Sequence, residues 1–293
     1  MVKTPADLLQ KVRELELVSR HNCSAAMTGT FASSLPGRGL VFHESRRYVE
    51  GDDVRSIDWK MTARLMEPYV KIFLDERERE IYVALDISKS MHGGWQKQTK
   101  LEFAIETAAT LIFSAHQNRD KFGLVLFAGK AIKTLKPSGG RRHLFECLKS
   151  LIEVQNYPAS MLDDSDPRTA IHAIEAQRGR KFVIFMISDF IDDDVPDDLK
   201  YLRARHDVNL MRIYDPFEKS SNANLKLWGE SPEKRGLNRG ATFWPFKNAE
   251  IVKDHIQDAC NRNRILLEDI ATTDKIQNAL TRMFHRKRKL LAK

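Results

Sequence analysis

The segment that most constrains the fold is Phe182–Ile187, in which six consecutive residues are apolar. A strand with one face in water alternates apolar and polar residues, whereas a strand covered on both faces does not. The segment therefore predicts a central strand of a parallel sheet that carries helices on both faces. Further apolar strands are expected from Ile81 onward, at Phe122–Phe127 and near Val208–Tyr214.

Helices are predicted between these strands. Residues 99–102 read Thr-Lys-Leu-Glu, a capping-box pattern in which the two polar side chains satisfy backbone N–H groups at a helix start. Other helices are expected at 141–153, 169–178 and 196–205, and a short strand at Ala131–Leu135 beside the second strand. This order of elements predicts an α/β fold with a doubly wound, mostly parallel sheet.

The remaining segments have weaker patterns. Pro5–Arg20 has apolar residues at helical spacing and is expected to form an amphipathic helix. Residues 28–45 are rich in Gly, Ser and Pro and are expected to be loop, followed by a short strand at Tyr69–Phe73. Residues 216–247 are expected to be irregular, and two helices are expected from Asn248 onward.

We therefore divide the chain into an amino-terminal extension, 1–80, packed on the sheet, and an α/β domain, 81–293, that ends in helices. Hydrophobic residues make up 42% and charged residues 30% of the chain, as in soluble globular proteins. No apolar run approaches the roughly 20 residues that span a bilayer. The three cysteines are far apart and suggest neither a zinc site nor a disulfide framework, so a cytoplasmic location is expected.

Polar side chains gather where two of the predicted strands end. Asp86, Ser88 and Ser90 follow the first strand at alternate positions, so in extended backbone they face the same way. Ser188 and Asp189 directly follow the central apolar strand. Because open α/β sheets bind ligands at the carboxyl ends of their strands, the two carboxylates are expected to meet across one cleft.

This arrangement predicts a metal site. Two carboxylates that meet without a cation repel each other, and at least one pKa rises. A divalent cation removes that conflict, and oxygen donors without Cys or His suit Mg²⁺ first, with Mn²⁺ or Ca²⁺ as alternatives. Thr169 is expected to supply a third ligand segment, although Asp164 and Asp166 lie nearby and Thr169 also suits a plain helix start. The predicted ligands are Asp86, Ser88, Ser90, Thr169 and Asp189.

Other kinds of function have less support in the sequence. There is no GxxxxGKS or GxxxxGKT nucleotide loop and no GxSxG nucleophile elbow. A metal-dependent hydrolase that uses the same cleft remains the alternative. The last twelve residues contain six basic side chains and no acid. Such a tail can bind nucleic acid, but it is more often a solvated helix end. The acidic run at 192–194 is expected to be a solvated loop.

The spacing of the site residues resembles a known motif. Asp86, Ser88 and Ser90, with Ser188-Asp189 about a hundred residues later, resemble the metal-ion-dependent adhesion site of von Willebrand factor A-like domains. A more specific resemblance, to the domain of unknown function 58 family, covers about residues 35–215. It is carried by GRGLVF at 37–42, RYVEGDDVRSIDWK at 47–60, TAR at 62–64 and DERER at 75–79.

The family resemblance implies a von Willebrand factor A-like fold without catalytic residues, and a helix that contains Leu266 near the carboxyl end. Family members are commonly encoded beside MoxR-type AAA+ ATPases. The resemblance therefore implies a cytoplasmic adaptor that binds such an ATPase and an unknown client protein in protein maturation or remodelling. One departure concerns the metal site, because Arg168-Thr169 stands where a Gly-Thr pair is usual.

The block from Gly51 to Arg79 mixes acidic and basic residues densely. We expect Asp53, Arg55, Asp58 and Arg64 to form a polar network that ties the extension to the sheet, with a partner-binding surface as the alternative. Buried charges without partners cost several kcal/mol each, so any of these groups that is buried should be paired.

Overall fold

The computed structural model of the protein describes residues 5–22, 36–37, 41–74, 80–94, 98–155, 157, 163–177, 181–191, 196–216 and 256–291. The acidic run at 192–194 and, apart from Pro216, the expected irregular segment lie outside these residues. Contacts divide the chain into two compact units, one formed by residues 1–28 and 79–293 and the other by residues 29–78. This division differs from the expected boundary at residue 80, because the first helix groups with the α/β sheet. Packing of the extension on the sheet stays a prediction.

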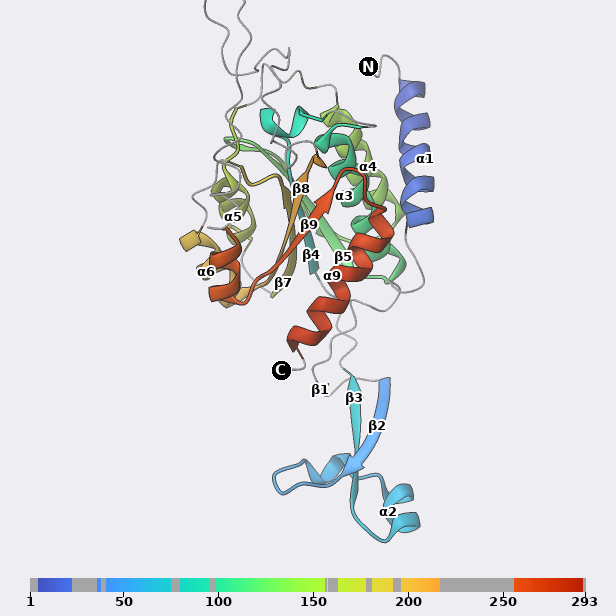
Figure 1. Ribbon diagram of the computed structural model, residues 1–293. Coiled ribbons are helices and arrows are strands. Elements are labelled where there is room, and N and C mark those ends of the chain that lie inside the picture. Colours follow the sequence, from blue (N-terminus) through green and yellow to red (C-terminus); the bar gives the residue numbers. More distant parts are fainter. Residues whose placement is uncertain are drawn as a thin grey trace, which may run out of the picture. The chain divides into compact units, whose positions relative to one another are not determined.

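The larger unit contains a six-stranded sheet with the strand order β6-β5-β4-β7-β8-β9 (Figure 1). Neighbouring strands are parallel except for β5 and β6, which are antiparallel. The predicted α/β fold with a mostly parallel sheet is thus confirmed. The strands are β4 (Glu80–Asp86), β5 (Lys121–Phe127), β6 (Ala131–Ser138), β7 (Phe182–Ser188), β8 (Asp207–Tyr214) and β9 (Leu266–Ala271).

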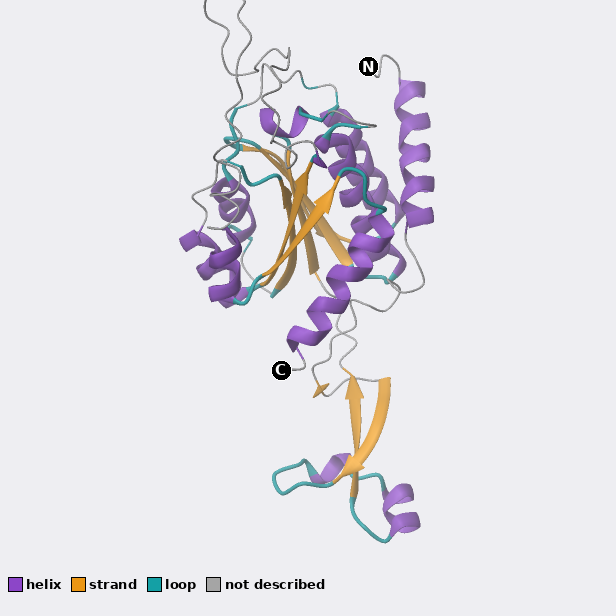
Figure 2. Cartoon of the chain, in the orientation of Figure 1, coloured by secondary structure: helices purple, strands orange, loops and turns teal. Residues whose placement is uncertain are grey.

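Helices flank both sides of this sheet (Figure 2). On one side, Tyr82 of β4 and Ile184 of β7 share a buried core with Ile171 of α5. On the other side, the ring of Phe185 in β7 meets the edge of Phe284 in α9, with centroids 6.1 Å apart. Successive strand residues point to opposite faces of the sheet. A strand whose consecutive residues are all apolar therefore contributes to the cores on both faces. The helices are α1 (Pro5–Asn22), α3 (Lys100–Gln117), α4 (Arg141–Val154), α5 (Pro167–Glu175), α6 (Pro196–Arg205) and α9 (Ile276–Leu291).

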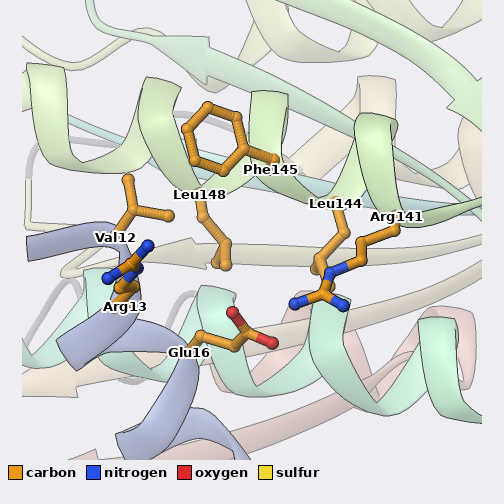
Figure 3. Close-up of a pocket in the computed structure, with 7 residues that line it drawn as sticks. All are labelled: Val12, Arg13, Glu16, Arg141, Leu144, Phe145 and Leu148. Atoms are coloured by element: carbon orange, nitrogen blue, oxygen red, sulfur yellow. The ribbon is translucent and has the colours of Figure 1, made fainter. Parts of the chain in front are cut away.

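Helix α1 packs on α3 and α4, with Val12 and Leu15 buried. A groove of about 210 Å³ runs between α1 and α4 and is lined by apolar side chains with charged groups at its margin (Figure 3). Among the described helices, none combines the length and the apolarity needed to cross a bilayer.

The carboxyl-terminal region contains the two expected helices, residues 256–263 and α9, but a strand lies between them. This strand is β9, so Leu266 lies in a strand that pairs parallel with β8 and not in a helix. Glu268 and Asp269 interrupt the apolar pattern of this strand, so the sequence pattern does not indicate a buried strand. Glu268 is buried because Arg282 and Arg286 of α9 pair with it, and Asp269 pairs with Arg212 of β8.

The smaller unit contains a three-stranded antiparallel sheet in the order β1 (Pro36–Gly37), β3 (Tyr69–Leu74), β2 (Val41–Arg47), with a 3-10 turn (Val54–Ser56) and helix α2 (Trp59–Leu65). The loop predicted at 28–45 is therefore wrong for residues 36–37, which form β1, and for residues 41–45, which belong to β2. Both segments pair with β3, and this pairing orders residues whose Gly, Ser and Pro content suggested a loop.

Part of the predicted polar network lies inside this smaller unit. Asp58 is buried and caps α2 by accepting hydrogen bonds from the backbone N–H groups of Lys60 and Met61, and its other oxygen accepts from Ser45 Oγ. Asp53 caps the 3-10 turn through the N–H of Arg55. These contacts stabilise the fold of the unit itself, and a role in tying the extension to the sheet stays a prediction.

Candidate functional site

The candidate site lies where the strand order reverses. Strand β5 lies on one side of β4 and β7 on the other, and open α/β sheets form a ligand-binding crevice at the carboxyl ends of such strands. Asp86 is the last residue of β4, and Asp189 directly follows β7. Both carboxylates are buried, with residue exposures of 0% and 3%.

The carboxylate of Asp86 is held by three hydrogen-bond donors from three segments. Oδ1 accepts from the backbone N–H of Ser88 at 2.8 Å. Oδ2 accepts from the hydroxyl of Ser188 at 2.6 Å and from that of Ser165 at 2.7 Å. The end of β4, the end of β7 and the loop before α5 are thus joined at one side chain.

Burial, and then the negative charge of Asp189, raise the pKa of Asp86 to about 6, although its three hydrogen bonds act in the opposite direction. The structure therefore shows the conflict between two carboxylates that the sequence predicts. An added positive charge at this position would relieve it.

The carboxylate of Asp189 is held by a hydroxyl and an ammonium group. Oδ1 accepts from Ser90 Oγ at 3.2 Å, and Ser90 Oγ lies 3.1 Å from Ser88 Oγ. Oδ2 lies 2.8 Å from the Nζ atom of Lys100, a residue that is itself only 1% exposed. The structure thus brings Asp86, Ser88, Ser90 and Asp189 into one connected group, and their role as metal ligands stays a prediction.

Thr169 lies in the first turn of α5, and its contacts are those of a helix start. Its hydroxyl donates to the backbone oxygen of Asp166 at 2.8 Å and lies 3.4 Å from that of Ala128. Asp166 is the N-cap of the helix. Within the described residues, the side chain from this segment that reaches Asp86 is Ser165. A ligand role for Thr169 stays a prediction that these contacts do not support.

Sequence reasoning missed two members of the site, Lys100 and Ser165. Lys100 is the first residue of α3, whose predicted capping box between Thr99 and Glu102 is present. Cations are disfavoured at the start of a helix by the macrodipole, so a lysine there could have indicated an acidic partner nearby. Ser165 lies in a polar loop, where nothing in the sequence separates it from its neighbours.

The donor atoms fit a hard divalent cation. A carboxylate has about four lone-pair sites. Donors from described residues occupy three of them on Asp86 and two on Asp189, which leaves room on both for a cation. The described part of the chain holds no cluster of three or more His, Cys, Asp or Glu side chains arranged for a metal. An ion here would use two carboxylates, serine hydroxyls and water, a ligand set that suits Mg²⁺.

Comparisons with known proteins place the chain in a family. Residues 44–227 match the model of the family described as protein of unknown function DUF58. Uncharacterized proteins of Mycobacterium tuberculosis (Rv1480, strain H37Rv) and Mycobacterium bovis (Mb1516) are 30% identical over 210 residues, which are 71% of this chain and 66% of each relative. The chain thus spans just under two thirds of the length of these curated relatives.

Two solved structures resemble the fold. The conserved hypothetical protein BatB from Bacteroides thetaiotaomicron is 18% identical with a TM-score of 0.49, over 72% of this chain and 99% of that one. An aerotolerance-related membrane protein from Bacteroides fragilis gives the same identity and TM-score over 71% and 99%. The family match covers more than half of the chain and includes the predicted motifs at 47–60, 62–64 and 75–79, and the protein therefore belongs to the DUF58 family.

Proposed function

We propose that this chain is a non-catalytic protein-interaction module that binds an acidic group of a partner protein through a divalent cation at the carboxyl edge of its sheet. The observation that carries the proposal is the pair of buried carboxylates, Asp86 and Asp189, each of which accepts a hydrogen bond from at least one serine hydroxyl. A bound Mg²⁺ would supply the missing positive charge and offer a coordination position to a carboxylate of the partner.

The residues of the site have separate tasks in this proposal. Asp86 and Asp189 would hold the ion, and the hydroxyls of Ser88 and Ser90 would add neutral oxygen ligands. Ser165 and Ser188 fix the orientation of the Asp86 carboxylate through its Oδ2 atom. Their hydrogen bonds leave its Oδ1 atom, which accepts from one backbone N–H, to face the ion.

A von Willebrand factor A-like fold and an ATPase partner are part of the proposed function. A single antiparallel edge strand, β6, on an otherwise parallel sheet, with the Asp-x-Ser-x-Ser segment after β4, supports a von Willebrand factor A-like domain. Membership of the DUF58 family supports a MoxR-type AAA+ ATPase as partner, with this chain as the adaptor that presents an unknown client.

Calorimetry with Mg²⁺ and Mn²⁺ tests the metal claim. With acetate present in place of the partner's carboxylate, the wild-type chain is expected to bind one ion, and Asp86→Ala is expected to lose that binding. Glu153→Ala is the control, because the Glu153 side chain is 37% exposed and pairs with Lys133 and Lys149 outside the site. Equal behaviour of the wild type and Asp86→Ala toward both ions would remove the metal from the proposal.

A pull-down tests the partner claim. The tagged chain is expected to retain the ATPase or client in the presence of Mg²⁺ and to release it when EDTA is added. Retention that is indifferent to EDTA and to Asp86→Ala would show that the interaction uses another surface.

One observation favours the alternative, a metal-dependent hydrolase. Two buried carboxylates at the carboxyl edge of an α/β sheet would also suit a metal ion that activates water for hydrolysis. Assays with phosphoester and peptide substrates in the presence of Mg²⁺ separate the two functions. Turnover that is lost in Asp189→Asn would favour the enzyme over the interaction module.

A further inference from the structure

A buried lysine occupies part of the predicted cation site. The side chain of Lys100 is 2% exposed, and its Nζ atom lies 2.8 Å from Oδ2 of Asp189, whose side chain is 1% exposed. An ammonium group this deeply buried requires a close anion, and Asp189 is that anion. The pair joins residues 89 positions apart, from the start of α3 and from the loop after β7.

The ammonium supplies only half of the charge that the carboxylates require. Asp86 and Asp189 together carry two negative charges, and Lys100 contributes one positive charge. A divalent cation added beside Lys100 would leave the group with one excess positive charge. A carboxylate from a partner would then make the group neutral.

The same ammonium also opposes the ion directly. Lys100 already uses one oxygen of Asp189, so an ion on that carboxylate would lie close to the ammonium and be repelled by it. Repulsion between like charges is strong at a buried position, where water screens little.

We propose that Lys100 makes cation binding conditional on an acidic ligand: it weakens binding of the ion alone and strengthens binding of the ion together with a carboxylate. This inference rests on the proposed function and specifies its regulation. Lys100 acts through its positive charge, which favours binding of the ion when a partner supplies an anionic group.

Mn²⁺ titrations of the full chain, with and without acetate as the carboxylate probe, test this inference. Lys100→Met keeps the length of the side chain and removes its charge. This variant is expected to bind Mn²⁺ alone at least about tenfold more tightly than the wild type. A charge within about 4–6 Å of a titrating group shifts its pKa by about 1–3 units, and one unit corresponds to a factor of about ten in binding. Acetate is expected to tighten Mn²⁺ binding to the wild type and to have little effect on the variant.

Two controls accompany the titration. Lys100→Arg keeps the charge and is expected to behave as the wild type does. Lys133→Met removes an ammonium that pairs with Glu153 at 3.6 Å on the surface, and it is expected to leave Mn²⁺ binding unchanged. If Lys100→Met folds poorly without an ion, its thermal midpoint is expected to rise more with Mn²⁺ than that of the wild type.

The outcomes separate this inference from the function on which it rests. Wild-type binding of Mn²⁺ that depends on Asp86, with no gain in Lys100→Met, overturns the role of Lys100 and leaves the metal site standing. No binding by either protein, with or without acetate, overturns both. Tight binding by Lys100→Met and weak, acetate-dependent binding by the wild type support both.

Discussion

Protonation of Asp86 is expected to stabilise the protein when divalent cations are absent. Burial and the charge of Asp189 raise the pKa of Asp86 from 3.8 to about 6. An acid whose pKa is raised in the folded state contributes its stability below the unfolded pKa and loses it as pH rises through the folded pKa. One pKa unit corresponds to about 1.4 kcal/mol, so the loss between about pH 4 and about pH 6 is about 3 kcal/mol.

Urea unfolding in EDTA, measured from acidic to neutral pH on the wild type and on Asp86→Asn, tests this expectation. The Asn variant carries no charge at either pH, and the responses of most other carboxylates cancel in the comparison. As pH rises from about 4 to about 7, the free energy of unfolding of the wild type is expected to fall by about 3 kcal/mol relative to that of Asp86→Asn. The control Glu153→Gln, at a carboxylate that pairs with Lys133 and Lys149 outside the site, should follow the wild type. Parallel curves for the wild type and Asp86→Asn would refute the reasoning.

Three further perturbations have defined outcomes. In EDTA, Lys100→Met is expected to lower the free energy of unfolding by about 3–5 kcal/mol, because Asp189 stays buried without its counter-ion, and adding Asp189→Asn should restore much of that loss. Asp58→Ala is expected to cost about 1 kcal/mol through the lost cap of α2, seen as faster hydrogen exchange in residues 59–65. Cys147 is buried and its pKa is raised to about 12, so it should resist alkylation at pH 8 until the protein unfolds.

Each of these outcomes has a result that contradicts it. A wild-type urea midpoint for Lys100→Met would mean that the Lys100–Asp189 pair adds no stability. Unchanged exchange in α2 after Asp58→Ala would show that the cap is dispensable. Fast alkylation of Cys147 in the native protein would mean that the buried face of α4 opens readily.

How well the sequence predicts an element depends on where its stabilising partners lie. Strand β7 can be predicted from the sequence because its first six side chains are apolar, and burial on both faces requires no other pattern. Strand β9 cannot be predicted in the same way, because it contains the buried Glu268. The charge of Glu268 is neutralised by Arg282 and Arg286, which lie 14 and 18 residues further on. Pairing at such distances leaves no local pattern.

The site follows the same division. Asp86, Ser88 and Ser90 have a spacing of two, which predicts a common orientation in extended backbone, but only Asp86 lies in a strand. Ser90 lies in a 3-10 turn (Lys89–His92), so its contacts with Ser88 and Asp189 come from that turn and not from strand alternation. The contribution of Lys100 depends on a residue 89 positions away, and that of Ser165 on one 79 positions away. Their participation is a property of the packed sheet, which sequence spacing does not encode.

The ion pairs of α9 also bear on how the protein should be shortened for study. The basic carboxyl-terminal stretch looks dispensable, yet Arg282 and Arg286 neutralise a carboxylate that is only 1% exposed, and Lys287 pairs with Asp207 of β8. A clone that stops before Arg282 would leave Glu268 without its counter-ions. It would also remove most of α9, which packs on the edge strand β9. Expression boundaries are therefore best set beyond Lys287, and any loss of nucleic-acid affinity in a shorter version would first have to be distinguished from unfolding.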